Sequence, residues 1–328
     1  MFRSKKVGAV LQLLFSFVLL AGLIWLVGWD ALVMQLSALA WTWYLLAFGL
    51  YLLSVALRAY RWFVLLNSLN KRPSFTHLLY LYYVGFFANN FIPSGFGGDV
   101  VKVVSLRQSY GRGAEALSSV LMDRIIGLLG SSLLALVALL WNVLAGGLAI
   151  ELVPAIWLTI ILVSVGIPVA FGLMRWTEPV KTAVRLFPFL QKIPKFNKLE
   201  ELADTVRRYP LSALLKSLSV SLPFTACLVL AHFSIAKSLG VDLPLSIFSL
   251  FVPIIAIVGL LPISFNGLGV REGLYQFLYV PIGVPDATAL AMSLALYFLR
   301  FGTGLVGGLL YAGRNVAGLW AAGDESPA

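Results

Sequence analysis

Residues 261–273 read LPISFNGLGVREG and interrupt an apolar run that begins with SIFSLFVPIIAIVGL and resumes with LYQFLYV. Proline removes an amide donor and glycine favours unwound backbone, so an ordinary membrane helix cannot continue through this stretch. Backbone amides exposed to lipid are costly, and such a break is tolerated only where protein covers it or where it lines a polar cavity. The stretch is therefore a candidate binding site.

A second break with related chemistry lies in the first half of the chain, where residues 92–102 read IPSGFGGDVVK. Paired interruptions of apolar segments in the two halves of a membrane protein are typical of transporter substrate sites. The glycines either form amide nests that bind phosphate or simply permit a tight turn. The predicted turn residues are Pro93, Gly95, Gly97, Gly98, Pro262, Gly267 and Gly269.

The composition is that of a polytopic membrane protein. Of the 328 residues, 60% are hydrophobic and only 12% are charged, which is outside the range of soluble domains. The net charge of +10 comes mostly from loops between apolar segments. This distribution favours contact with anionic lipid headgroups and argues against nucleic acid as a partner. The single cysteine, Cys227, excludes an internal disulfide.

Six segments contain the about 20 apolar residues that a membrane span needs. They are residues 7–27, 43–63, 116–141, 152–173, 211–236 and 287–312. The first has no small-residue cleavage site, so we expect a retained span rather than a signal peptide. The helical arms beside the two breaks are too short to cross, and residues 77–108 and 245–280 are predicted to form re-entrant helical hairpins.

The basic residues predict the orientation of these segments. With both hairpins re-entrant, the cytoplasmic side receives both termini and the basic linker at residues 175–210, while the other side receives Lys237. A full crossing by the first hairpin alone would place that linker outside, against the positive-inside rule. We therefore expect a multi-pass protein of the plasma (inner) membrane with cytoplasmic N- and C-termini.

The predicted segments repeat. Residues 1–150 and residues 151–316 each contain two spans, a hairpin and a further span, in opposite orientations, and residues 317–328 form a short tail. The predicted fold is thus an all-α polytopic membrane protein with six full transmembrane helices and two opposed hairpins in an inverted repeat. The Trp-rich segment 29–41 is expected at the outer surface, and the basic linker along the cytoplasmic headgroups.

Charged residues inside the membrane are candidate functional residues, because each is costly there unless it is paired or hydrated. In both halves an acid at the hairpin tip precedes an arginine of the next span, so we expect Asp99 to face Arg124 and Glu272 to face Arg300. These pairs either attach hairpins to spans or help to hold an anionic headgroup. The predicted substrate-binding residues are Asp99, Lys102, Asp123, Arg124, Arg271, Glu272 and Arg300.

Other polar residues have less specific interpretations. Arg58 and Arg61 lie near the predicted end of the second span and are either snorkelling anchors or a site where headgroups enter. His232 is expected to be packed and hydrogen-bonded rather than a proton relay. The glycines around Gly307 are typical of close helix packing.

The sequence contains no HExxH, GxSxG, P-loop or Cys/His metal spacing, so we expect no metal site, no cofactor and no enzyme.

Four of these stretches resemble the transmembrane-domain (flippase-domain) family of lysylphosphatidylglycerol synthetases, the membrane half of the multiple peptide resistance factor. They are RAYRW at 58–62, NNFIPSGFGGDVVK at 89–102, LMDRIIGLL at 121–129 and LPISFNGLGVREG at 261–273. The resemblance implies a flippase-like unit that moves a phospholipid or polyprenyl-linked lipid between leaflets. The soluble aminoacyl-transferase domain is missing, so lipid lysylation is not expected. Lys102 stands where relatives often have Arg, and Asn266 where many have Gly.

We therefore expect a flippase whose midplane site passes the headgroup of an anionic phospholipid or polyprenyl-linked (glyco)lipid by alternating access. Two alternatives remain at this point. One is an intramembrane lipid-modifying enzyme that uses Asp99, Asp123 or Glu272 as acid or base. The other is a scaffold that docks a lipid or glycan synthase through the basic linker. The expected partners are membrane lipids, and a synthase of the same pathway is the second candidate.

Overall fold

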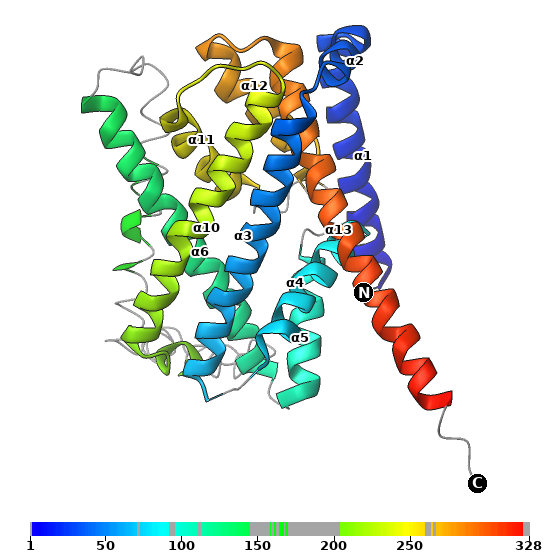
Figure 1. Cartoon of the computed structure of the whole chain (residues 1–328), viewed down its shortest axis with the longest axis vertical. Helices are drawn as coiled ribbons and strands as arrows, with labels where there is room; N and C mark the ends of the chain where they lie inside the picture. Colours follow the sequence, from blue (N-terminus) through cyan, green and yellow to red (C-terminus); the bar gives the residue numbers. More distant parts are fainter. Residues whose placement is uncertain are drawn as a thin grey trace.

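The computed structural model describes residues 2–70, 73–91, 96–110, 113–144, 204–259, 264 and 267–323, together with isolated residues between 158 and 169. Within these ranges every regular element is helical (Figure 1). Most of the predicted fourth span and most of the basic linker lie outside the described residues. So do three of the predicted turn residues, Pro93, Gly95 and Pro262.

The described helices follow the predicted order of segments. Their bounds are α1 (Phe2–Val27), α2 (Trp29–Ser37), α3 (Trp41–Ser68), α4 (Phe75–Asn89), α5 (Gly97–Tyr110), α6 (Gly113–Leu144), α10 (Leu211–Ser238), α11 (Leu245–Val258), α12 (Val270–Tyr279), the 3₁₀ helix η4 (Val280–Ile282) and α13 (Asp286–Gly323). Four of them, α3, α6, α10 and α13, are long and apolar enough to cross a membrane. The chain is therefore an all-helical membrane protein.

The first apolar segment is broken near one end. Gly28 has a φ of 91°, a left-handed conformation that favours glycine, and the chain turns there so that α2 lies at 87° to α1. The Trp-rich segment is thus a short helix across the end of a long one, with Trp29 and Trp41 exposed. This geometry fits the predicted placement of the segment at a membrane surface.

Helices α4 and α5 form a hairpin whose outer ends both lie toward the lower end of the molecule in Figure 1. Their backbones meet at Gly85 and Gly98: a Cβ on Gly98 would lie 2.7 Å from the Gly85 carbonyl oxygen. The Asn89 side chain also accepts a hydrogen bond of 2.8 Å from the Gly98 amide. A larger residue at position 98 would therefore separate the two arms.

Helices α11 and α12 form the second hairpin, with their outer ends toward the opposite end of the molecule (Figure 1). Two of the predicted turn glycines, Gly267 and Gly269, have φ values of 80° and 85°, so the turn needs residues without a Cβ. The Glu272 side chain accepts a 2.6 Å hydrogen bond from the Gly269 amide. This bond satisfies an otherwise unpaired amide at the start of α12.

The helix contacts connect the two halves of the chain in a regular way. Helix α3 packs on α10, α4 packs on α13, and α11 packs on α6. The helices of the two halves correspond in order: α3 to α10, α4 to α11, α5 to α12 and α6 to α13. When each helix is replaced by its counterpart, the same set of contacts results. A two-fold repeat would give this pattern, although the predicted domain division itself stays a prediction.

Small residues make the contact between α13 and α4 close. A Cβ on Gly307 would overlap the Tyr83 carbonyl oxygen, and one on Gly308 would lie 2.7 Å from the Phe87 ring. The interpretation of these glycines as helix-packing residues is confirmed. Tight packing here fixes the position of the first hairpin against the last helix.

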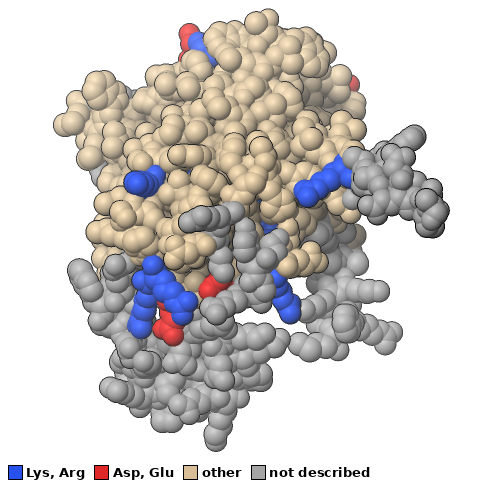
Figure 2. Space-filling model, turned by 60° about the horizontal axis from the view of Figure 1, so that its bottom comes forward, with Lys and Arg blue, Asp and Glu red and all other residues tan. Residues whose placement is uncertain are grey.

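Charge is unevenly distributed over the surface. Figure 2 shows most of the visible Lys and Arg gathered over the lower part of that view, while the upper part is almost free of charge. Arg107 lies in the last turn of α5, and Arg208, which precedes α10, forms a 3.8 Å ion pair with Glu115 of α6. The orientation in which the basic end faces the cytoplasm stays a prediction from the positive-inside rule.

Candidate functional site

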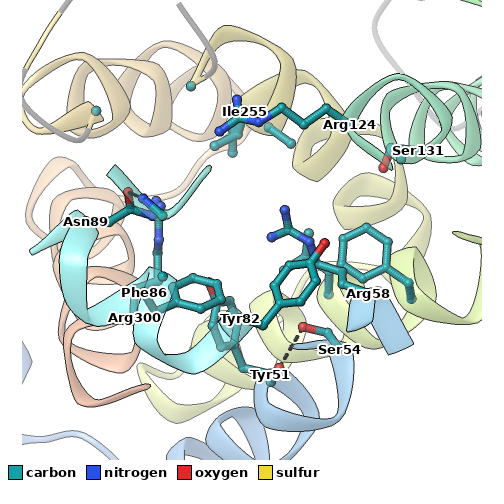
Figure 3. A pocket seen from close by; sticks show the side chains of 18 of the residues that line it. Tyr51, Ser54, Arg58, Tyr82, Phe86, Asn89, Arg124, Ser131, Ile255 and Arg300 are labelled. Carbon is teal, nitrogen blue, oxygen red and sulfur yellow. Dashed lines mark hydrogen bonds between the residues drawn. The ribbon is translucent and has the colours of Figure 1, made fainter. Parts of the chain in front are cut away.

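A cavity of about 250 Å³ lies between the two hairpins and is lined by residues of the α-helices α3, α4, α5, α6, α10, α11, α12 and α13. Figure 3 shows labelled side chains directed into it from several sides. Among the described lining residues six are cationic: Arg58, Arg61, Lys102, Arg124, Arg271 and Arg300. Asp99 is the carboxylate among them. The cavity therefore carries a large excess of positive charge.

The first ion cluster lies at the tip of the first hairpin. Asp99, in the first turn of α5, forms an ion pair with Arg124 of α6, as the sequence predicted. Lys102 lies one turn along α5, with its Nζ 3.8 Å from the Asp99 carboxylate, and is only 5% exposed. The Arg124 guanidinium also lies over the Phe96 ring at 4.6 Å. One carboxylate is thus shared by two cations.

The second ion pair joins α3 to α6 and was not predicted. Arg61 donates a 2.7 Å hydrogen bond from Nε to Asp123 and a 3.1 Å bond to the Ser221 hydroxyl of α10. The Tyr82 hydroxyl donates to the other carboxylate oxygen of Asp123. Arg61 is only 1% exposed. Its interpretation as a snorkelling anchor is therefore wrong, because α3 continues to Ser68 and carries Arg61 into the core.

The third ion pair corrects the predicted partner of Glu272. Its Oε1 lies 3.0 Å from the neighbouring Arg271 guanidinium and accepts a 3.0 Å hydrogen bond from Ser293 of α13. Its other oxygen accepts from the Gly269 amide, so this fully buried carboxylate is paired with Arg271 and not with Arg300. The sequence pointed to Arg300 because an acid precedes an arginine in the same order in both halves, and adjacent helical residues normally point apart. Glu272 and Asp123 lie behind the cavity wall, and their arginine partners line it.

Two of the lining arginines have no carboxylate partner among the described residues. Arg58 lies over the rings of Tyr82 and Phe224 at 5.4 and 5.6 Å, and its buried Nε has no hydrogen-bond partner there. Arg300 forms neither an ion pair nor a hydrogen bond within the described part of the chain. Both guanidinium groups are therefore available to a ligand.

The neutral residues of the site are only partly visible in the sequence. His232 is 4% exposed, its Nδ1 lies 2.7 Å from the Leu228 carbonyl oxygen, and its ring stacks on Tyr275. The interpretation of His232 as a packed residue is confirmed. Tyr82 was missed, because a tyrosine within an apolar helix gives no signal of its own. Lys102 lies 3.3 Å from the centre of the Tyr82 ring, so this tyrosine orients two of the charged groups.

Two comparisons with known proteins bear on this arrangement. The family model described as "Lysylphosphatidylglycerol synthase TM region" matches residues 10–308, a range that includes every described residue of the cavity lining. The chain is also 24% identical over 310 residues to the UPF0104 membrane protein PH1989 of Pyrococcus horikoshii. That similarity covers 88% of this chain and 92% of the archaeal protein.

Proposed function

Because the chain belongs to the lysylphosphatidylglycerol synthase TM region family, we propose that it is a lipid transporter of the flippase type. The proposed cargo is an anionic phospholipid or a polyprenyl-linked (glyco)lipid that moves between leaflets. The observation that carries the proposal is the cationic cavity between the hairpins. Buried positive charge of this kind suits a negatively charged headgroup, while the apolar chains of the lipid remain in the bilayer.

The mechanism that we propose is alternating access. Both hairpins are taken as re-entrant from opposite membrane faces, within eight membrane segments and with cytoplasmic termini in the plasma membrane. Each hairpin then closes the cavity toward one face, and opening them in turn exposes the headgroup to each leaflet. The exchangeable contact pattern of the two halves supports this proposal, because equivalent hairpins can serve as equivalent gates.

The alternative of an intramembrane lipid-modifying enzyme needs a carboxylate free to accept or donate a proton. Asp99 is paired with Arg124 and Lys102. Asp123 is bound by Arg61 and Tyr82, and Glu272 by Arg271, Ser293 and the Gly269 amide. Carboxylates held in this way are poor general acids or bases. Their engagement favours transport over catalysis.

Alanine at Arg124 or Arg300 is expected to slow lipid movement about tenfold or more, since each change removes a charged donor from the cavity. The protein would be reconstituted in vesicles with fluorescent phosphatidylglycerol or phosphatidic acid, and an impermeant quencher would report the outer-leaflet fraction over time. Arg314→Ala is the matched control, because exposed Arg314 packs on Tyr80 outside the cavity.

Several results would contradict the proposal. One is that the wild-type protein moves neither lipid, and another is that folded Arg124→Ala and Arg300→Ala variants move both lipids at the wild-type rate. Mass spectrometry of the same vesicles separates the enzyme alternative, because an enzyme changes the mass of the lipid and a transporter changes only its leaflet. The scaffold alternative predicts that deletion within residues 181–198 of the basic linker abolishes function in cells while movement in vesicles is absent throughout.

A further inference from the structure

We infer that the cavity selects a headgroup whose phosphate carries about two negative charges, as a phosphomonoester or a diphosphate does, over a singly charged phosphodiester. This inference rests on the proposal that the cavity holds a lipid headgroup, and it specifies the chemistry of that headgroup. Four observations carry it: the charge balance of the lining, the environment of the unpaired arginines, their arrangement around the cavity, and its size.

The charge balance is read from the ion pairs. Arg61 with Asp123 and Arg271 with Glu272 are one-to-one pairs and contribute no net charge. Asp99 neutralises only one of Arg124 and Lys102. With Arg58 and Arg300 unpaired, the described residues leave three positive charges around the cavity when Lys102 is protonated.

The environment makes these charges costly in the absence of a ligand. Arg58 is enclosed by the rings of Tyr82 and Phe224, and Arg300 lines the same cavity as the cations Arg58 and Arg271. Uncompensated charge of one sign within an apolar bundle is strongly unfavourable. A singly charged phosphodiester compensates one of the three excess charges, whereas a doubly charged phosphate compensates two. The doubly charged phosphate therefore neutralises one more positive charge than the phosphodiester, and we expect the cavity to bind it more tightly for this reason.

The geometry of the donors favours the same ligand. In Figure 3, Arg58, Arg124 and Arg300 approach the cavity from three different sides and from three different helices. A guanidinium binds phosphate oxygens through a planar pair of N–H donors. A phosphomonoester presents three terminal oxygens in different directions, and a phosphodiester presents one fewer. Donors on three sides therefore match the terminal group of a monoester or diphosphate.

The size of the cavity limits what can occupy it. Its volume of about 250 Å³ is at or below the lower end of the range for small-molecule sites, so it accommodates a phosphate-bearing headgroup and not the apolar chains. Polar side chains such as Ser54, Asn89 and Ser131 complete the lining and offer further hydrogen bonds. The ligand is thus recognised at its phosphate, and the chains stay outside.

The test compares lipids with identical chains and different headgroups. Affinities of the detergent-solubilised full chain would be measured by native mass spectrometry for phosphatidic acid, diacylglycerol pyrophosphate and phosphatidylglycerol. We expect phosphatidic acid and the pyrophosphate to bind about tenfold or more tightly than phosphatidylglycerol. A tenfold preference for the pyrophosphate over phosphatidic acid would show that the cavity recognises a diphosphate headgroup. Equal binding of the two lipids would show that it recognises a single doubly charged phosphate.

Variants connect the preference to the two unpaired arginines. Arg58→Gln and Arg300→Gln are expected to remove most of the preference for phosphatidic acid over phosphatidylglycerol, whereas Arg300→Lys, which keeps the charge, should retain more of it. Arg314→Gln is the matched control outside the cavity. Equal binding of phosphatidic acid and phosphatidylglycerol by the wild-type protein would overturn the inference. So would an unchanged preference in both folded glutamine variants. The wild-type comparison remains decisive if a glutamine variant does not fold.

Failure of this inference can be told apart from failure of the proposed function, because binding in detergent needs no transport. If lipids cross the vesicle membrane while phosphatidic acid and phosphatidylglycerol bind alike, the inference alone fails. If the preference holds and no lipid crosses, the flippase proposal fails while the phosphate site stands.

Discussion

Replacing Asp123 with alanine is expected to lower the free energy of unfolding by about 3–5 kcal/mol, the usual cost of removing one partner of a buried ion pair. The change leaves the Arg61 guanidinium without a counter-charge at 1% exposure, and it also removes the acceptor of the Tyr82 hydroxyl. Because Tyr82 lies under Lys102 and Arg58, the loss should spread to the charged wall of the cavity.

The measurement is the unfolding of the purified protein in detergent, followed by circular dichroism or tryptophan fluorescence. Asp242→Ala serves as the control, because the Asp242 side chain is 91% exposed in its ion pair with Lys237 and exposed pairs contribute little. The double variant Arg61→Met with Asp123→Leu should be more stable than Asp123→Ala, since it leaves no uncompensated charge. Equal stability of Asp123→Ala and the wild-type protein would contradict the assignment of this pair as a structural element.

The second large effect is expected at the contact between α13 and α4. Gly307→Ala should destabilise the protein by about 3 kcal/mol, at the upper end of the range for overpacking. The added Cβ would overlap the Tyr83 carbonyl oxygen, and a backbone atom cannot rotate away as a side chain can. The helices must therefore separate, and the first hairpin must move with α4.

Gly49→Ala is the matched control for this prediction. Gly49 also lies within a helix, α3, but a Cβ there would have no atom within 4 Å. Replacing a helical glycine with alanine at an open position is expected to be neutral or to stabilise the protein by about 0.5–1 kcal/mol. If Gly307→Ala and Gly49→Ala change the free energy of unfolding by the same amount, the contact at Gly307 is not close.

The sequence predicted the described helices because their signals are local. Apolar length marked α3, α6, α10 and α13, and the two breaks marked the hairpin tips. Two predicted spans stopped early: residues 43–63 ended before the end of α3 at Ser68, and residues 287–312 ended before the end of α13 at Gly323. Helix α3 carries both arginines into the core, where Arg61 pairs with Asp123 and Arg58 lies over the Tyr82 ring. Hydropathy alone does not include such contacts.

The contacts of the candidate site were less predictable. The Asp99–Arg124 pair was found because a hairpin tip and the following helix are neighbours in space. The Arg61–Asp123 pair joins residues of helices separated by the first hairpin, and nothing in the sequence specifies which faces of those helices meet. Glu272 was assigned to Arg300 from a charge order that repeats, whereas a neighbouring arginine and Ser293 already occupy its oxygens. Local charge order thus selects the residues of the site but not their partners.

The contact of α4 with α13 also has a consequence for synthesis at the ribosome. The fourth helix leaves the exit tunnel long before the last one, yet α13 supplies the glycine surface on which it packs. In the interval the nascent first half presents an unfilled helix surface and buried cations to the surrounding bilayer. Contacts between such distant parts of a chain form late and slowly. Completion of the last helix therefore sets the moment at which the newly inserted first half becomes stable.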